Sequence, residues 1–224
     1  MMHETWSAVD EYLSQTLGAT DTVLEHVLAA SARAGLPAIQ VSPTQGKLLH
    51  ILARAVGARR ILEVGTLGGY SAIWLARALP ADGRLITLEL DARHAHVARE
   101  NLAHAGVSER VEVRIGPALD ELPKIASAGA GPFDLVFVDA DKPRNAEYVT
   151  WALRLARVGS LIVVDNVVRD GEVVDAASTD ASVQGTRRVL ELLAAERRVS
   201  ATAIQTVGAK GYDGFAVAVV LTTP

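Results

Sequence analysis

Two short segments of the sequence each end a hydrophobic run in acidic or amide side chains. The first, residues 135–142, reads LVFVDADK, and the second, residues 161–166, reads LIVVDN. Apolar runs of this length are typical of buried parallel strands. Because the carboxyl ends of parallel strands border the ligand crevice of an open α/β sheet, we expect Asp139, Asp165 and Asn166 to converge there.

Two carboxylates and an amide oxygen suit a hard divalent cation. Mg²⁺, Mn²⁺ and Ca²⁺ prefer oxygen ligands, whereas zinc sites usually contain Cys or His. The alternative is that Asp139 and Asp165 each cap the helix that follows their strand. Because the same pattern occurs at two strand ends, we favour a cation site over two separate helix caps.

The rest of the sequence alternates between predicted strands and helices after residue 57. Strict alternation predicts a doubly wound α/β fold with a parallel sheet and right-handed crossovers. A short glycine-containing connection through Gly208, Gly211 and Gly214 joins the last two strands, which predicts an antiparallel C-terminal pair and a mixed sheet of about seven strands. The predicted helices are 4–17, 21–34, 43–56, 70–78, 92–105, 118–127, 145–156 and 182–197, and the predicted strands are 60–64, 84–88, 110–115, 133–138, 160–164, 199–207 and 215–221.

Composition limits the classes of function. With 224 residues, 50% of them hydrophobic, the chain is expected to form a single domain over 1–224, with N-terminal helices over 1–57 and an α/β core over 58–224. A net charge of −4 argues against nucleic acid as a partner, and the absence of cysteine excludes disulfides and thiolate chemistry. No stretch resembles a signal peptide or a bilayer-spanning segment, so we expect a cytoplasmic protein without a membrane partner.

The junction after the first predicted strand reads ILEVGTLGGYSA over residues 61–72. Its glycines, Gly65, Gly68 and Gly69, permit a tight turn and a close approach of backbone to ligand, and Glu89 ends the next strand, where a carboxylate can accept from ribose hydroxyls. This pattern predicts a nucleotide-type cofactor site. The alternative is a glycine turn required only for packing.

The turn alone does not distinguish NAD from S-adenosylmethionine, but three observations favour the latter. Leu67 occupies the second glycine position of G-x-G-x-x-G, Glu63 lies at the end of the first strand, and a cation-type cluster accompanies the turn. A dehydrogenase would instead need an acid for hydride transfer.

With its DADK and DN motifs at this separation, the chain resembles the cation-dependent O-methyltransferases of the caffeoyl-CoA and catechol O-methyltransferase type, especially their small bacterial members. The similarity extends from about Val41 to the C-terminal GFAVAVVL. It implies a Rossmann-like methyltransferase fold, a homodimer, a cation on Asp139, Asp165 and Asn166, and Lys142 in the position of the catalytic base. It also implies that S-adenosyl-L-methionine is bound by Val41, Glu63, Gly65, Thr66, Ser71, Glu89, Ala118 and Asp139, the last of these also serving in catalysis.

The sequence therefore predicts methyl transfer to a hydroxyl of a small catechol-like or hydroxycinnamoyl-like acceptor. Lys142 would remove the proton from an acceptor hydroxyl, unless it is only a solvated lysine at a helix start. Two alternatives remain, an NAD(P)-dependent oxidoreductase and a non-catalytic cofactor-binding protein. Residues 167–183 follow directly on the predicted cation ligands and are expected to form a mobile substrate loop.

Overall fold

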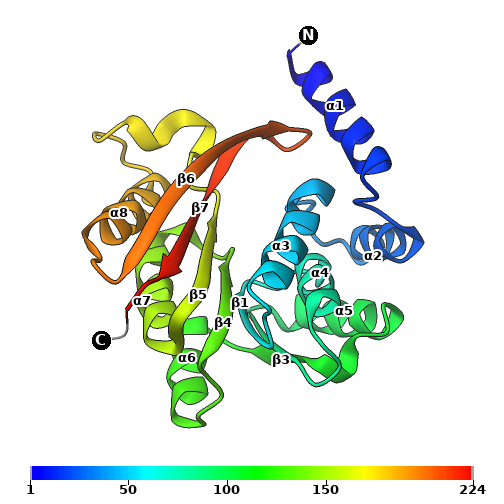
Figure 1. Cartoon of the computed structure of the whole chain (residues 1–224). Helices are drawn as coiled ribbons and strands as arrows, with labels where there is room; N and C mark the ends of the chain where they lie inside the picture. The colour runs from blue at the N-terminus through cyan, green and yellow to red at the C-terminus, as the bar shows by residue number, and fades with distance from the viewer. Residues whose placement is uncertain (1, 223–224) are drawn as a thin grey trace.

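The structure, a computed structural model, describes residues 2–222 and contains a seven-stranded mixed sheet with helices on both faces (Figure 1). The strands are β1 (Arg60–Val64), β2 (Arg84–Glu89), β3 (Val111–Ile115), β4 (Phe133–Val138), β5 (Ala156–Asp165), β6 (Val199–Gly208) and β7 (Gly211–Val220). Their order in the sheet is β3-β2-β1-β4-β5-β7-β6. β1 to β5 pair in parallel, while β7 runs antiparallel to β5 and β6. The predicted fold class is confirmed.

The helices also follow the prediction closely. They are α1 (Met2–Thr16), α2 (Thr22–Arg33), α3 (Pro43–Ala55), α4 (Tyr70–Ala78), α5 (Ala92–His104), α6 (Ala118–Ser127), α7 (Asn145–Leu155) and α8 (Ala181–Ala195). Three short 3₁₀ helices, η1 (Ser108–Arg110), η2 (Lys142–Arg144) and η3 (Arg169–Val174), were not predicted. No helix within residues 2–222 is long and apolar enough to cross a bilayer.

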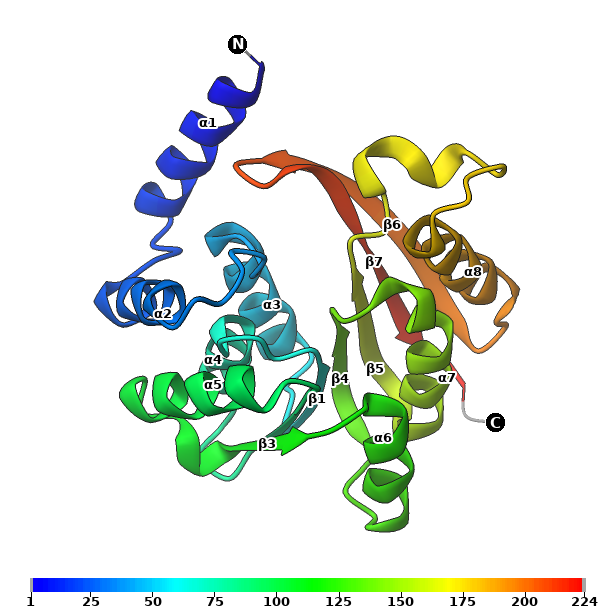
Figure 2. The same ribbon diagram turned by 180° about the vertical axis from the view of Figure 1, so that it is seen from behind.

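Successive residues of the central strands pack on opposite faces of the sheet. In β4, Leu135 and Phe137 belong to the core formed with α2 to α5, whereas Val136 and Val138 belong to the core formed with α6 to α8. Figure 2 shows these two helical layers from behind the view of Figure 1. Because both faces are covered, every residue of β4 is buried, including the polar Asp134.

Two strands begin earlier than predicted. β5 starts at Ala156 instead of residue 160. The Ser160 hydroxyl donates to the Phe133 carbonyl (2.6 Å) and accepts the Arg157 N–H (2.9 Å). These two hydrogen bonds hold residues 156–159 beside β4. β7 starts at Gly211 instead of residue 215. The predicted connection through Gly208, Gly211 and Gly214 is therefore wrong in part, since all three glycines pair within β6 and β7.

The turn between β6 and β7 is a two-residue hairpin loop. Gly208 pairs with Gly211, which has φ +94°, so only Ala209 and Lys210 lie between the strands. The tip lies beside α1 (Figure 1). There Asp10 Oδ2 accepts the Ala209 N–H at 2.8 Å. A Cβ at position 208 would lie 2.2 Å from that oxygen, so a larger residue there would displace the Asp10 side chain.

Candidate active site

The glycine turn after β1 brings two strand ends together. Gly65 has φ +100°, a conformation that L side chains rarely adopt, and a Cβ there would lie 2.0 Å from the backbone oxygen of Asp139. The Asp139 N–H in turn donates to the Val64 carbonyl at 2.8 Å. Glycine is therefore required at position 65, and the ends of β1 and β4 lie in direct contact.

Glu89, at the end of β2, holds the same turn. Its Oε2 accepts the backbone N–H groups of Thr66 (3.2 Å) and Leu67 (2.7 Å), and its Oε1 accepts that of Asp91 (3.0 Å). Leu67 has φ 50°, a left-handed conformation that is uncommon outside glycine. Glu89 therefore has a structural role that the sequence did not reveal, and its contact with ribose hydroxyls stays a prediction.

Glu63 lies beneath the turn and is fully buried. Thr87 Oγ1 donates to Glu63 Oε2 at 2.6 Å, and Thr66 Oγ1 lies 2.5 Å from Thr87 Oγ1. Burial raises the pKa of Glu63 to about 8, although the Thr87 hydrogen bond opposes the shift. The carboxyl group is therefore mainly protonated at neutral pH, and it does not belong to the lining of the cavity above it.

A cavity of about 1160 Å³ opens at this edge of the sheet. It extends from the glycine turn and the start of α6 to η2 and the hairpin tip, and it is large enough for a nucleotide-type cofactor together with a second small molecule. Of the residues predicted to bind the cofactor, those that line this cavity are Val41, Gly65, Thr66, Ser71, Glu89, Ala118 and Asp139.

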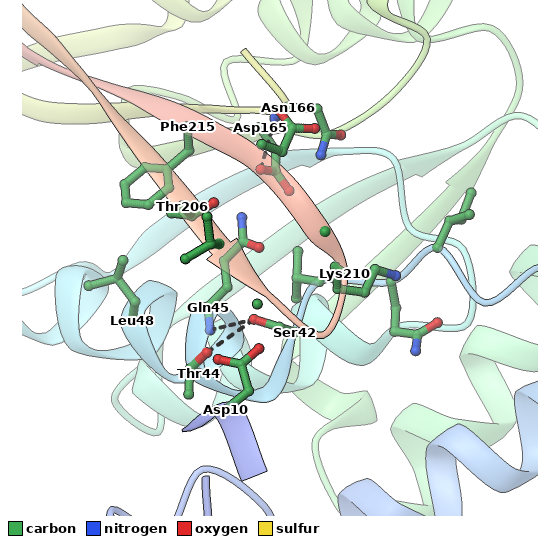
Figure 3. A pocket seen from close by; sticks show the side chains of 17 residues that line it. Asp10, Ser42, Thr44, Gln45, Leu48, Asp165, Asn166, Thr206, Lys210 and Phe215 are labelled. Atoms are coloured by element: carbon green, nitrogen blue, oxygen red, sulfur yellow. Dashed lines mark hydrogen bonds between the residues drawn. The ribbon is translucent and has the colours of Figure 1, made fainter. Parts of the chain in front are cut away.

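A smaller cavity of about 280 Å³ shares several lining residues with this one, and Figure 3 shows Asp165 and Asn166 at its wall. Asp139 lines the larger cavity, Asp165 lines the smaller one, and Asn166 lines both. Burial, and then the negative charge of Asp139, raise the pKa of Asp165 to about 7, while Lys142 and a hydrogen bond from Gln45 oppose the shift. The three predicted ligands are therefore brought to one corner of the site, as their positions at strand ends led us to expect.

Lys142 belongs to the same corner. Its Nζ donates to Asp139 Oδ1 at 2.7 Å, and the residue is 9% exposed in the first turn of η2. The alternative of a solvated lysine at a helix start is therefore wrong. Asp139 and Asp165 do not cap helices either, because Asp141 stands at the start of η2 and Val168 at the start of η3.

Similarity to known proteins agrees with this geometry. The family model described as O-methyltransferase matches residues 14–216. A catechol O-methyltransferase of Niastella koreensis is 53% identical over 220 residues, which cover 98% of this chain and 100% of that protein. The chain belongs to the O-methyltransferase family.

Solved structures of other O-methyltransferases are closely similar along their whole length. The enzyme of Bacillus cereus, in complex with SAH, has a TM-score of 0.96 and 58% identity and covers 97% of this chain and 99% of that chain. TomG of Streptomyces achromogenes, involved in tomaymycin synthesis and in complex with SAM, has a TM-score of 0.95 and 54% identity and covers 99% of each chain. The predicted enzyme class, an S-adenosylmethionine-dependent O-methyltransferase, is confirmed, and the oxidoreductase and the non-catalytic binding protein are set aside.

In this O-methyltransferase, the charges of Asp139, Asp165 and Lys142 fit a divalent cation. Burial and the nearby Asp139 both disfavour the ionised form of Asp165, and Lys142, which donates a hydrogen bond to Asp139, opposes this through its charge. A doubly charged cation would offset this penalty, and carboxylate and amide oxygens are its preferred ligands. Within residues 2–222 no group of three His, Cys, Asp or Glu side chains could hold a metal ion, so Asn166 would have to supply the third ligand.

Two further polar residues of the O-methyltransferase site were missed from the sequence. Lys210, at the hairpin tip, lines both cavities, and its Nζ donates to the Ala38 carbonyl at 2.8 Å. Gln45, in the first turn of α3, extends toward Asp165 in Figure 3. No local signal marks either residue, because each reaches the site only when an element distant in sequence folds against the strand ends.

Proposed function

We propose that this O-methyltransferase transfers the methyl group of S-adenosylmethionine to one hydroxyl of a small catechol-like or hydroxycinnamoyl-like acceptor, with the aid of a divalent cation. The observation that carries the proposal is the convergence of Asp139, Asp165 and Asn166 with Lys142 beside one large cavity. The name of the Niastella koreensis relative, catechol O-methyltransferase, supports this acceptor class.

The cofactor would occupy the part of the larger cavity between the glycine turn and the start of α6. The lining residues Gly65, Thr66 and Ser71 would contact one portion of it, and Glu89 the ribose. The sulfonium of S-adenosylmethionine supplies an activated methyl group. The chain then has mainly to align donor and acceptor, an effect that can contribute roughly 7–11 kcal/mol in favourable systems.

Asp139, Asp165 and Asn166 would hold the cation. When bound, a divalent cation lowers the pKa of an oxygen acid that it contacts, here an acceptor hydroxyl. The smaller cavity, which Asp165 and Asn166 line, would take the remainder of the acceptor.

Lys142, as the neutral amine, would accept the proton of the acceptor hydroxyl. The side chain is buried, and its Nζ is fixed by Asp139, so its position is set before any acceptor binds. A base that is held in place in this way acts without the entropic cost of ordering a flexible side chain.

A screen of diphenols with a labelled methyl donor tests the proposal. Ortho-diphenols should be methylated in the presence of Mg²⁺, while their meta and para isomers, which cannot present two adjacent oxygens, should react far more slowly. Equal methylation of all isomers, or full activity in EDTA, would contradict the cation-dependent mechanism.

We also propose that the 1–224 domain forms a homodimer. β6 is an edge strand whose middle residues are all exposed, and Ile204 and Val207 on it are 51% and 52% exposed. Val9 and Tyr12 of α1, a helix that contacts the β6–β7 hairpin, are exposed as well. Such an edge is open to pairing or packing with a second copy. Light scattering at micromolar concentration should give twice the monomer mass, and a monomer mass would contradict the proposal.

A further inference from the structure

The segment that carries Asn166 is strained. Asn166, Arg169 and Asp170 have φ values of 58°, 56° and 55°, all in the left-handed region that favours glycine. Asparagine and aspartate tolerate this region better than other residues, but arginine does not. A turn with three such residues persists only where the surrounding structure determines it, and strain of this kind is concentrated at functional sites.

The side chain that determines this turn is Asp213, in β7. Its Oδ1 accepts the backbone N–H groups of Val168 (3.0 Å), Arg169 (3.0 Å) and Gly214 (2.9 Å). The Arg169 guanidinium lies 4.0 Å from Oδ2, and the Val167 N–H donates to the Gly214 carbonyl at 3.0 Å. A carboxylate that accepts several N–H groups binds them more strongly than a neutral acceptor does.

The fold does not depend on this carboxylate alone. Val167 and Val168 are 1% and 7% exposed and anchor the segment in the core of α6 to α8, and Asp165 pairs with Phe215 in the sheet. What the carboxylate adds is the conformation of the turn at Val168 and Arg169. Asn166 begins the same segment, two positions before Val168, and lines both cavities.

We propose that Asp213 is a positioning residue for the cation site, which acts by holding the turn that directs the Asn166 amide. This inference rests on the proposed function, because it assumes that Asn166 is a cation ligand. Asp213 lies 47 positions after Asn166 in the chain and itself stands at the smaller cavity, yet its Oδ1 is already occupied by three backbone donors.

The test measures the binding of Mn²⁺ to the full chain by calorimetry, without acceptor. Asp213→Ala should raise the Kd for Mn²⁺ by ~10-fold, the lower end of the range for groups that orient metal ligands. Asp213→Asn, which keeps one acceptor oxygen, should raise it by only about 3-fold, a partial rescue expected because charged acceptors form the stronger hydrogen bonds. The Kd for S-adenosylmethionine should stay unchanged in both variants, whereas general unfolding would weaken both ligands together.

A control and a double variant complete the test. Asp170→Asn, in the same turn, should bind Mn²⁺ like the wild type. Asn166→Gly removes the amide and the strain at position 166, so adding Asp213→Ala to it should cause no further loss, since no side chain is left to direct. If the two substitutions instead raise the Kd for Mn²⁺ independently, so that their factors multiply in the double variant, the inference is wrong.

The outcomes separate this inference from the proposed function. If the wild type binds Mn²⁺ and Asp213→Ala binds it equally well, only the positioning role is wrong. If the wild type itself does not bind Mn²⁺, the cation site and the positioning role are both wrong. Should Asp213→Ala fail to fold, Asp213→Asn decides, with an unchanged Kd for Mn²⁺ overturning the inference.

Discussion

Glu89 fixes the backbone of Leu67 in a left-handed conformation, with its Oε2 accepting the Leu67 N–H at 2.7 Å. The same device recurs elsewhere in the chain. Asp213 binds two consecutive N–H groups of the turn after β5, and Asp134 binds those of Arg59 and Arg60 at the start of β1. At three places a carboxylate from one strand thus sets the backbone of a neighbouring segment.

The dual position of Glu89, at the turn and at the cavity, predicts a large effect on the cofactor. Glu89→Ala should weaken binding of S-adenosylmethionine by about 10- to 100-fold, the equivalent of one hydrogen bond to a charged group. Calorimetry measures this directly. Glu112→Ala, an exposed carboxylate on the adjacent β3, is the control and should leave the affinity unchanged. Unchanged affinity in Glu89→Ala would remove Glu89 from the site.

The convergence of Asp139, Asp165 and Asn166 could be predicted from the sequence, whereas the residues that support it could not. Asp139, Asp165 and Asn166 each follow a hydrophobic run, and the rule that parallel strands end at one edge places them together. Lys210 and Asp213 lie on the C-terminal hairpin, and no local pattern tells which residues of a hairpin face a distant turn. Their positions depend on the two-residue turn and on α1, which are matters of tertiary packing.

The strand starts were missed for the same reason. Glycines 211 and 214 predict a loop by local propensity, yet both pair within the sheet, because a Cβ at Gly214 would lie 2.4 Å from the Ile204 carbonyl. At position 214 glycine reflects the close packing of two backbones, whereas Gly211, with φ +94°, lies directly after the hairpin turn.

Asp134 should be a major determinant of stability, independent of the site. Its Oδ2 accepts the N–H groups of Arg59 (2.7 Å) and Arg60 (2.9 Å), and its Oδ1 accepts Arg157 Nε (2.8 Å). Asp134→Ala should lower the free energy of unfolding by about 2–4 kcal/mol, since it leaves backbone donors unpaired. Denaturant titration measures this. Asp82→Asn, which alters only an exposed ion pair with Arg59, should cost less than about 1 kcal/mol.

The contribution of Asp134 should also depend on pH. Burial raises its pKa, but hydrogen bonds from Arg59, Arg60 and Arg157 outweigh burial and hold the pKa below the ordinary value of 3.8. A depressed folded-state pKa stabilises the protein above the unfolded-state pKa, and this stability is lost as the pH falls through the folded-state value. The stability difference between wild type and Asp134→Ala should therefore be constant at neutral pH and shrink below about pH 4. A difference that stays constant into that acidic range would contradict this assignment.

Removal of the cation should abolish turnover. EDTA should inactivate the enzyme and Mg²⁺ or Mn²⁺ should restore it, because without a cation the acceptor hydroxyl keeps its ordinary acidity. Asp165→Ala should reproduce the effect of EDTA and resist rescue by added Mg²⁺. Its affinity for S-adenosylmethionine should persist, since Asp165 is not among the residues that line the larger cavity. Full activity of the variant in EDTA would favour a simple acid–base methyltransferase.

Lys142 provides the sharpest test of the chemistry, because its Nζ is fixed by Asp139 and the side chain is buried. Lys142→Met keeps most of the bulk and removes the base, so turnover should fall by ~10²–10⁴ while the Kd values for S-adenosylmethionine and Mn²⁺ change little. Lys124→Met, an exposed lysine of α6, is the matched control and should be fully active.

A comparison of two acceptors tells whether Lys142 acts as a base or only packs in the site. An acceptor such as 4-nitrocatechol ionises readily in solution and needs less help from a general base, so Lys142→Met should lose much less turnover with it than with catechol. A packing defect would instead slow both acceptors to the same degree. If the variant keeps wild-type turnover with catechol itself, acidification of the acceptor is sufficient for its ionisation, and Lys142 serves only to pair with Asp139.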